Sequence, residues 1–331
     1  MFNFDEAKVR REHQNGVDII PQTEKIVDQV CRDGYSNIFY IGIGGTVLYA
    51  NQMMHIAKQL GSRIPLYIEN AADFNLEGNP FFNDQSIVVI ESISGDTKEV
   101  VEAVDKVHEA GARVIGYVEK EGTPLYEKCD YLVSTVGGGY YFWYTVTLRF
   151  LKNAGQFDKY GQFFKEIVHM PDNIVKVYRD ADEDARAYAE KYCDEPITYL
   201  IGSGNLEDWA ACYGMCIMEE MQWMRTRPVS AANFFHGTLE VIERDTPVIL
   251  MKGEDITRPQ MDRVEKFVNR ISAKVIVFDT KKFLLDGISD EFRGILSPIV
   301  MRSAFQRVNV HLEHMRRHPL AIRRYYRKLD Y

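Results

Sequence analysis

Two turns in the first half of the sequence combine small residues with hydroxyl groups, a combination that suits a phosphate group. One is Gly42-Ile-Gly-Gly-Thr46, and the other is Ser92-Ile-Ser-Gly-Asp-Thr97, which has three hydroxyls around a glycine. Each turn follows an apolar run and precedes a helical pattern, and helix N-termini attract anions through free N–H groups and the helix dipole. A single hydroxyl at such a position usually caps its helix, but three in one turn favour a phosphate site.

Neither turn matches a nucleotide-binding motif. The sequence has no GxxxxGKS or GxxxxGKT loop, and Gly42, Gly44 and Gly45 do not form GxGxxG. The predicted ligand is therefore a phosphate group that hydroxyls and backbone N–H groups can hold without a lysine or an arginine.

Glu220 is a candidate for moving protons. It lies in a predicted helix from about Leu206 to Met224, where the spacing places it on one face with Tyr213, Cys216 and Trp223. A carboxylate on such an apolar face is shielded from water, which suits acid–base catalysis. The alternative from spacing alone is an exposed helical glutamate.

His236 is a second candidate, because an imidazole exchanges protons near neutral pH. It follows Phe234-Phe235 and precedes Gly237, and the alternative is a surface or capping histidine. The other histidines form no HExxH motif, and Cys212 and Cys216 are better explained by packing than by metal binding. The sequence predicts no metal site.

The elements that position these residues follow from apolar runs that alternate with helical patterns. Buried strands alternating with helices predict parallel sheets covered on both faces. The predicted strands are 37–41, 65–68, 86–91, 113–118 and 131–133, and then 197–201, 247–251 and 274–278. Two α/β units of similar order indicate an internal duplication.

The predicted organisation has five segments. A helical connector separates the units, with Pro171 expected to break it. The aromatic run Gly137-Gly-Gly-Tyr-Tyr-Phe-Trp-Tyr144, at the start of this helical region, is predicted to be core. The segments are an N-terminal helical segment (1–35), a first domain that holds both phosphate-type turns (36–150), the connector (151–195), a second domain (196–300) and a helical, basic tail (301–331).

Composition excludes several classes of protein. The chain has 331 residues, 46% of them hydrophobic and 27% charged, which is typical of a folded protein. A net charge of −8 argues against a nucleic-acid partner. The five scattered cysteines favour a reducing compartment, and no apolar run reaches the roughly 20 residues of a membrane span. We therefore expect a cytoplasmic protein with no membrane partner.

These motifs together resemble the sugar isomerase (SIS) domain family, whose members bind phosphosugars through turns rich in serine and threonine. Cys216-Ile-Met-Glu-Glu-Met-Gln-Trp223 and Asn233-Phe-Phe-His-Gly-Thr-Leu-Glu-Val-Ile242 are similar to the family's catalytic glutamate helix and histidine loop. The paired units resemble the isomerase half of glucosamine-6-phosphate synthase. With the tail from His318 to Tyr331, the chain most resembles the Amadori-product deglycases, which act on fructose-asparagine, fructoselysine and glucoselysine 6-phosphates.

The resemblance implies an α/β fold of two tandem SIS domains, each a mostly parallel sheet flanked by helices. It also implies that Glu220 is the general acid/base and that His236 is its partner, while Arg324 and Lys328 in the tail contact the substrate. The residues implied to hold the sugar phosphate are Gly45, Thr46, Ser92, Ser94, Gly95 and Thr97.

Four positions depart from the family pattern. Thr46 stands where serine is frequent and keeps the hydroxyl, whereas Ile93 replaces a common glutamine. Asn233 and Thr238 replace the usual glutamate and proline of the histidine loop, so the resemblance does not define the shape of that loop.

The function that the resemblance implies is cleavage of a 6-phosphorylated Amadori product to glucose 6-phosphate and a free amino acid. Such chemistry needs no metal and no redox cofactor, and the partner is a small phosphosugar–amino acid conjugate. The resemblance also implies a homodimer or higher assembly with shared active sites. The alternatives are an aldose–ketose isomerase, an aminosugar-phosphate deaminase or a non-catalytic phosphosugar sensor.

Overall fold

The computed structural model describes residues 1–330 and divides into two compact units. The first unit is Ala7–Pro171, and the second unit joins Met1–Glu6 to the chain from Asp172 onward. The predicted tail ends at Tyr331, which lies outside the described residues. The N-terminal helices, predicted as a separate segment, belong mostly to the first unit.

The first unit is built on a five-stranded parallel sheet with the order β2-β1-β3-β4-β5. Its middle strand carries Ile87-Val-Val-Ile90, all fully buried, because β-branched side chains pack well on a pleated surface. The strands are β1 (Asn37–Gly42), β2 (Leu66–Asn70), β3 (Ser86–Ser92), β4 (Arg113–Val118) and β5 (Tyr131–Val133). All five predicted strands of this half are confirmed.

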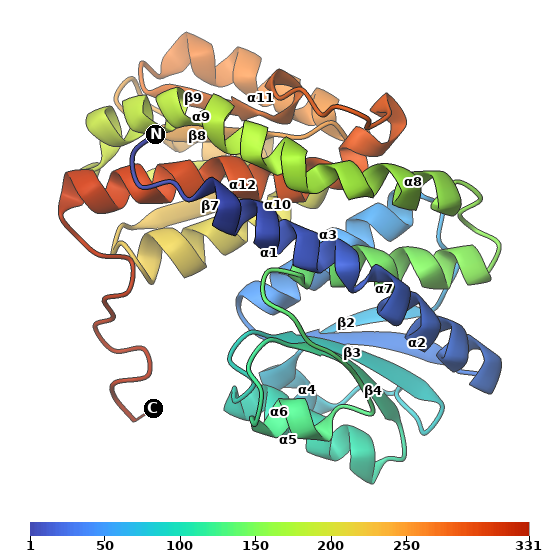
Figure 1. Ribbon diagram of the computed structural model, residues 1–331. Helices are drawn as coiled ribbons and strands as arrows, with labels where there is room; N and C mark the ends of the chain where they lie inside the picture. Colours follow the sequence, from blue (N-terminus) through green and yellow to red (C-terminus); the bar gives the residue numbers. More distant parts are fainter. Residues whose placement is uncertain (331) are drawn as a thin grey trace. The chain divides into compact units, whose positions relative to one another are not determined.

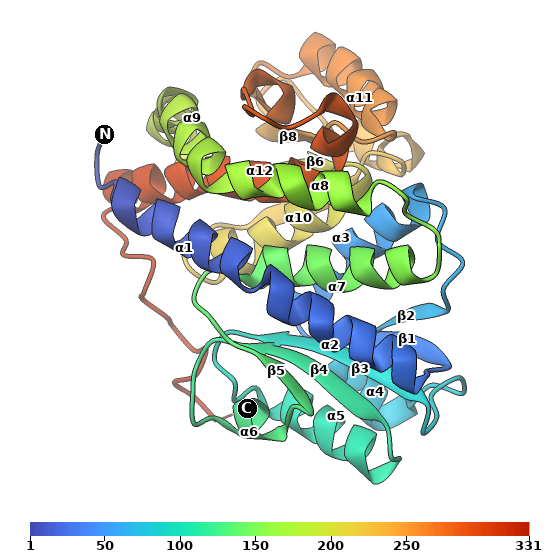
Figure 2. The ribbon, with the colours of Figure 1, turned by 45° about the vertical axis from the view of Figure 1, so that its right-hand side comes forward.

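Helices cover both faces of this sheet (Figures 1 and 2). On one face α4, α5 and α6 contribute Phe74, Val104 and Leu125 to a core against the strands. On the other face α7 buries the aromatic run, with the Trp143 ring 5.0 Å from that of Tyr40, which confirms the run as core. The helices are α1 (Glu6–Asp18), α2 (Ile20–Asp33), α3 (Gly45–Gln59), α4 (Ala71–Glu77), α5 (Lys98–Glu109), α6 (Pro124–Lys128), α7 (Gly139–Asn153), α8 (Tyr160–Glu166) and η1 (Ile167–His169).

The second unit is built on a four-stranded parallel sheet with the order β7-β6-β8-β9. The strands are β6 (Thr198–Gly202), β7 (Thr226–Ser230), β8 (Val248–Lys252) and β9 (Val275–Asp279). Three of them match predicted strands. The fourth, β7, was not predicted because it is polar and contains Pro228. An edge strand tolerates proline, since one side of it needs no ladder hydrogen bond.

The helices of the second unit depart from the prediction in two places. The helix expected from Leu206 to Met224 is made of consecutive 3-10, α and π segments and ends at Glu219, and the last long helix crosses residue 300 to end at Arg316. The connector is divided as expected, with Pro171 in the first turn of α9, where proline is tolerated. The helices are α9 (Met170–Tyr192), η2 (Gly204–Leu206), α10 (Glu207–Cys212), η3 (Tyr213–Glu219), η4 (Phe234–His236), η5 (Thr238–Val241), α11 (Arg258–Ile271), η6 (Thr280–Lys282) and α12 (Asp290–Arg316).

A buried arginine on α12 ties the N-terminus to the second unit. Arg307 is 1% exposed, pairs with Asp182 of α9 and donates a hydrogen bond to the carbonyl of Phe2 at 2.7 Å. Its guanidinium is thus paired with a carboxylate and a backbone carbonyl, as a buried charge requires. Across residues 1–330, none of the helices has both the length and the apolar composition that crossing a membrane demands.

Candidate active site

The two hydroxyl-bearing turns lie beside each other at one edge of the first sheet. Strands β1 and β3 are adjacent and parallel, with Tyr40 opposite Val89. The chain leaves β1 through α3 toward β2 and leaves β3 through α5 toward β4, on opposite sides. The carboxyl ends of β1 and β3 are therefore the switch point of the sheet, which is where open α/β sheets bind ligands.

The first turn is compact around Thr46. Its hydroxyl lies 3.1 Å from both the backbone nitrogen and the carbonyl oxygen of Ile43. A Cβ on Gly42 would lie 2.7 Å from that hydroxyl, so the close approach requires glycine. Helix α3 begins at Gly45 after Gly44, which has a φ of 61°, and so presents free N–H groups beside the hydroxyl.

The second turn is shaped by Ser92 and Gly95. Ser92 is buried, and its hydroxyl accepts a hydrogen bond of 2.9 Å from the Gly95 N–H. Gly95 has a φ of +70°, and a Cβ there would lie 1.9 Å from the Thr123 hydroxyl. Thr97 precedes α5, yet its side chain makes no capping hydrogen bond. Its hydroxyl is therefore not used as a cap, and Ser94 lies half-buried in the same turn.

Glu220 lies at the end of a π-helix rather than within an α-helix. Its N–H donates to the carbonyl of Met215, five residues earlier, at 3.0 Å, and η3 ends at Glu219. Trp223 lies beyond the helix with a φ of 55°, so the predicted apolar face of Tyr213, Glu220 and Trp223 is wrong. Single π-helical turns are rare and are frequent at functional sites.

An ion pair replaces the expected apolar environment of Glu220. The Arg323 Nε lies 2.8 Å from Glu220 Oε1, and the two side chains are 19% and 28% exposed. Arg323 also donates to the carbonyl of Leu320 at 2.5 Å, which fixes its guanidinium. The carboxylate therefore faces a cation from the tail and remains accessible to a ligand.

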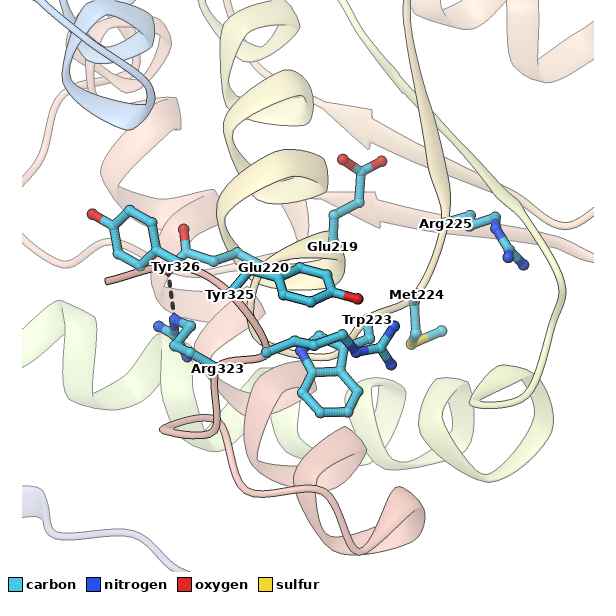
Figure 3. A pocket seen from close by; sticks show the side chains of 9 residues that line it. Glu219, Glu220, Trp223, Met224, Arg225, Arg323, Tyr325 and Tyr326 are labelled. Atoms are coloured by element: carbon cyan, nitrogen blue, oxygen red, sulfur yellow. Dashed lines mark hydrogen bonds and ion pairs between the residues drawn. The ribbon is translucent and has the colours of Figure 1, made fainter. Parts of the chain in front are cut away.

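A pocket of about 450 Å³ opens beside Glu220 (Figure 3). One wall is the end of η3 and the segment after it, and the other is the tail. The Arg324 guanidinium lies over the Trp223 ring, 4.1 Å from its centroid. The lining residues are Glu219, Glu220, Trp223, Met224, Arg225, Arg323, Arg324, Tyr325 and Tyr326.

The tail is held to this turn by several contacts but is not helical. Helix α12 ends at Arg316, and Arg317 adopts a left-handed conformation with a φ of 49°, so the predicted helical tail is confirmed to Arg316 and wrong for residues 317–330. Gln222 Nε2 donates to the carbonyl of His318 at 3.0 Å, and the His318 ring packs 4.3 Å from that of Trp223. The tail thus builds the wall that carries Arg323 and Arg324.

The other two candidate residues lie outside the pocket lining. His236 ends η4 with an exposed side chain, and its N–H donates to the carbonyl of Asn233 at 2.9 Å. Lys328 is exposed, and its N–H donates to the carbonyl of Tyr325 at 2.8 Å. The structure therefore groups Glu220 with Arg324 but not with His236 or Lys328.

The second sheet has a comparable turn after β6, and a carboxylate fills it. Asp255 Oδ2 accepts from the Asn205 N–H at 3.1 Å, and Oδ1 accepts from the Thr257 N–H at 2.8 Å and from the Thr257 hydroxyl at 2.5 Å. A Cβ on Gly204 would lie 2.3 Å from Oδ2. Asp255 is 7% exposed. These donors are of the kind that would hold a phosphate, and here they hold a side chain of the protein.

The sequence-based prediction gave no role in the site to Arg225, Tyr325 or Tyr326, and it counted Arg323 only among the basic residues of the tail. The arginine- and tyrosine-rich tail is a signal that could have indicated Tyr325 and Tyr326, whereas no pattern singles out Arg225. Within the part of the chain that the structure describes, no cluster of three or more His, Cys, Asp or Glu side chains is arranged to hold a metal ion.

Comparison with known proteins gives matches over most of the chain. Residues 35–151 match the family model of the SIS domain. The chain is 28% identical to the fructosamine deglycase FrlB of Bacillus subtilis (89% of this chain, 92% of that protein), and 21% identical to the fructoselysine 6-phosphate deglycase of Escherichia coli K12 (93% and 90%). Both relatives are enzymes.

Solved structures share the fold. A candidate phosphosugar isomerase of Bacillus subtilis superposes with a TM-score of 0.88 at 24% identity, covering 96% of this chain and 99% of that one. The C-terminal domain of glucosamine-fructose-6-phosphate aminotransferase from Francisella tularensis has a TM-score of 0.76 at 15% identity, covering 96% and 97%. At these identities the likeness concerns the fold, and both sheets of this chain take part in it.

Proposed function

We propose, from the match of residues 35–151 to the SIS domain family and the likeness to known deglycases, that the protein is a deglycase of 6-phosphorylated Amadori products. The substrate is a 6-phosphofructosyl amino acid or glucoselysine 6-phosphate, and the products are glucose 6-phosphate and a free amino acid. The likeness to two deglycases over about nine tenths of the chain supports the reaction class. The observation that carries the proposal is the Glu220 carboxylate at the edge of a pocket, in a chain that also has a phosphate-type turn pair.

The reaction on a fructosyl amine is a proton transfer followed by hydrolysis. Once the sugar ring is open, Glu220 removes a proton from C1, and the C1–H electron pair forms a C1=C2 enaminol as the C2 carbonyl oxygen takes up a proton. Return of a proton to C2 gives a C1=N aldimine of glucose 6-phosphate. Water adds to C1, the C–N bond breaks, and the amine leaves. A carboxylate positioned for such transfers typically contributes about 10²–10⁴-fold.

We assign the sugar phosphate to the turns that end β1 and β3. Ser92 and Gly95 shape the turn, while Thr46, Ser94 and Thr97 provide hydroxyls and Gly45 provides a free N–H at the start of α3. Uncharged donors at the start of α3 and α5 favour a dianion through the helix dipoles. Loss of this contact is expected to raise KM more than it lowers kcat.

We propose that His236 acts in ring opening in a site completed by a neighbouring copy of the chain, in a homodimer or higher assembly. Its exposed side chain, outside the Glu220 pocket lining, supports this role. Co-expression of Glu220→Gln and His236→Asn chains tests it: random pairing leaves half the dimers mixed with one intact site of two, or about a quarter of wild-type activity. No recovery, or a fully active monomer by light scattering, contradicts shared sites.

We further propose that the enzyme works in the cytoplasm, which five cysteines without a disulfide pattern support. The proposed activity is tested by incubating the protein with a panel of 6-phosphofructosyl amino acids and glucoselysine 6-phosphate, and following glucose 6-phosphate with a coupled dehydrogenase. Glu220→Gln is expected to abolish release while retaining phosphosugar binding, whereas the exposed Glu243→Gln control keeps both. Interconversion of fructose 6-phosphate and glucose 6-phosphate without amine release would identify an isomerase, and binding without turnover a sensor.

A further inference from the structure

We infer that the pocket beside Glu220 binds the amine-derived part of the substrate and recognises a free carboxylate on it through Arg324 and Arg225. This inference rests on the proposed function, because it assigns one end of the proposed substrate. It specifies the substrate class further: conjugates of amino acids whose carboxylate is unblocked.

Charge pairing within the pocket leaves two guanidinium groups for a ligand. Glu219 accepts hydrogen bonds from the Thr226 hydroxyl at 2.8 Å and the Thr226 N–H at 3.2 Å, and Glu220 is paired with Arg323. Arg225 and Arg324 also line the pocket, and within residues 1–330 neither forms an ion pair. A carboxylate is the group that a guanidinium binds with two parallel hydrogen bonds.

Arg324 is also prepared for this contact. Its guanidinium stacks on the Trp223 ring at 4.1 Å, which occupies the flat face and leaves the N–H groups on the edge free to donate. Trp223 itself has a φ of 55°, a strained conformation for a bulky residue. That conformation, with the His318 ring packed 4.3 Å away, holds the indole under the arginine.

The position of the pocket agrees with the chemistry. The amine nitrogen is bonded to C1, the carbon that Glu220 deprotonates. The amine portion of the substrate must therefore lie next to the Glu220 carboxylate. The carboxylates of Glu219 and Glu220 suit the ammonium group that is released, and the arginines suit its carboxylate. A pocket with both charges therefore fits a zwitterion better than a phosphate dianion.

The remaining lining suits the carbon skeleton of an amino acid. Trp223, Met224, Tyr325 and Tyr326 present apolar surface, and the cavity of about 450 Å³ lies in the range of small-molecule sites. Trp223 is 36% exposed and Tyr325 60% exposed, so a bound side chain would cover them.

The test compares two substrates that differ only at the carboxylate: a 6-phosphofructosyl amino acid and its carboxamide. With the wild-type protein we expect kcat/KM to be about 10- to 100-fold higher for the acid, mostly through KM, as for a hydrogen-bonded charge. Arg324→Gln and Arg225→Gln are expected to bring the ratio of the two kcat/KM values, acid over carboxamide, close to one. Arg270→Gln, an exposed arginine on α11, is the matched control.

Calorimetric titration separates this inference from the proposed function. If the wild-type protein cleaves both substrates with equal kcat/KM, or if Arg324→Gln and Arg225→Gln keep the preference, the inference is wrong and the deglycase function stands. If the protein cleaves neither, but binds the acid at least about 10-fold more tightly than the carboxamide and loses this in Arg324→Gln, the pocket assignment stands and the function fails. Equal binding without cleavage overturns both.

Discussion

Arg323 Nε lies 2.8 Å from Glu220 Oε1, and this ion pair joins the C-terminal tail to the turn that follows η3 across 103 residues of sequence. The proposed proton-transferring carboxylate therefore has a partner that belongs to a segment without regular secondary structure. Through this ion pair the reactivity of Glu220 is expected to depend on the order of the tail.

Loss of that contact is expected to loosen the tail more than it destabilises the fold. Both side chains are partly exposed, so Arg323→Gln should lower the free energy of unfolding by less than about 1 kcal/mol. Cleavage by chymotrypsin after Tyr325 and Tyr326 should become faster, because the tail opens more often. Lys328→Gln removes a tail charge without this contact and serves as the control; equal cleavage rates in the two variants would refute the coupling.

The turn after β3 gives a matched glycine pair. Gly95 and Gly122 have φ values of +70° and +66°, but a Cβ on Gly95 would lie 1.9 Å from the Thr123 hydroxyl, whereas a Cβ on Gly122 meets nothing within 4 Å. Alanine costs about 1 kcal/mol of strain at either position. Only Gly95→Ala should also displace the turn, and weaken glucose 6-phosphate binding at least about 10-fold by calorimetry. Equal weakening in both variants would count against a phosphate site there.

Asp255 provides a test of the filled turn in the second sheet. Asp255→Ala leaves the Asn205 and Thr257 N–H groups without their acceptor, which is expected to lower the free energy of unfolding by about 1–3 kcal/mol. Inorganic phosphate should restore part of this loss by occupying the same donors. Thermal unfolding in phosphate and in chloride at equal ionic strength measures the effect.

Asp279→Ala is the control for that experiment. It breaks the ion pair with Arg258 but removes no acceptor from the turn after β6. Phosphate should therefore stabilise it no more than it stabilises the wild-type protein, and equal recovery in the two variants would argue against an anion site at Asp255.

The pH dependence of stability is expected to have a contribution from Asp28. A bidentate hydrogen bond from Arg149, with distances of 2.6 and 2.7 Å, lowers the pKa of Asp28 to about 2 from its ordinary 3.8, against the opposing effect of burial. Because the folded-state pKa is lower, the stabilisation is complete above about pH 4 and is lost as the pH falls toward about 2.

Asp28→Asn should therefore lower the free energy of unfolding near neutral pH, and this deficit should vanish in acid. Solvent screening of a side chain that is 27% exposed limits the deficit to about 1 kcal/mol. Urea unfolding between pH 2 and pH 7 measures it. The exposed Asp158→Asn control should show no such pH-dependent difference, and a deficit for Asp28→Asn that persists at pH 2 would contradict the assignment.

Local patterns predicted the parts of the fold that depend on local physics. The run Ile87–Ile90 predicts a buried strand because it is continuously apolar and β-branched, which is typical of strands in a parallel sheet covered on both faces. The turns at Thr46 and Ser92 could be located because a strand, a glycine and a helix follow in order. Strand β7 could not be located, since its polar residues and Pro228 give no strand pattern of their own, and the strand forms by pairing with β6 at the edge of the sheet.

The pocket was beyond sequence reasoning for a different reason. No periodicity links Glu220 to Arg323, which meet only because the chain after α12 turns back on itself at Arg317. The apolar face inferred for Glu220 assumed 3.6 residues per turn, and η3 has a different repeat. Residue types pointed to Glu220, but helix type and a distant tail determine what it faces.

The π-helix has a consequence for chain length. Its hydrogen bonds span five residues, as from Glu220 to Met215 and from Gln222 to Ile217, so each hydrogen-bonded loop holds one more residue than in an α-helix. Removal of a single residue between Tyr213 and Glu219 would allow an α-helix to form, because six α-helical residues turn the chain about as far as seven π-helical ones. The π-helix therefore accommodates one additional residue while Glu220 stays on nearly the same face of the helix.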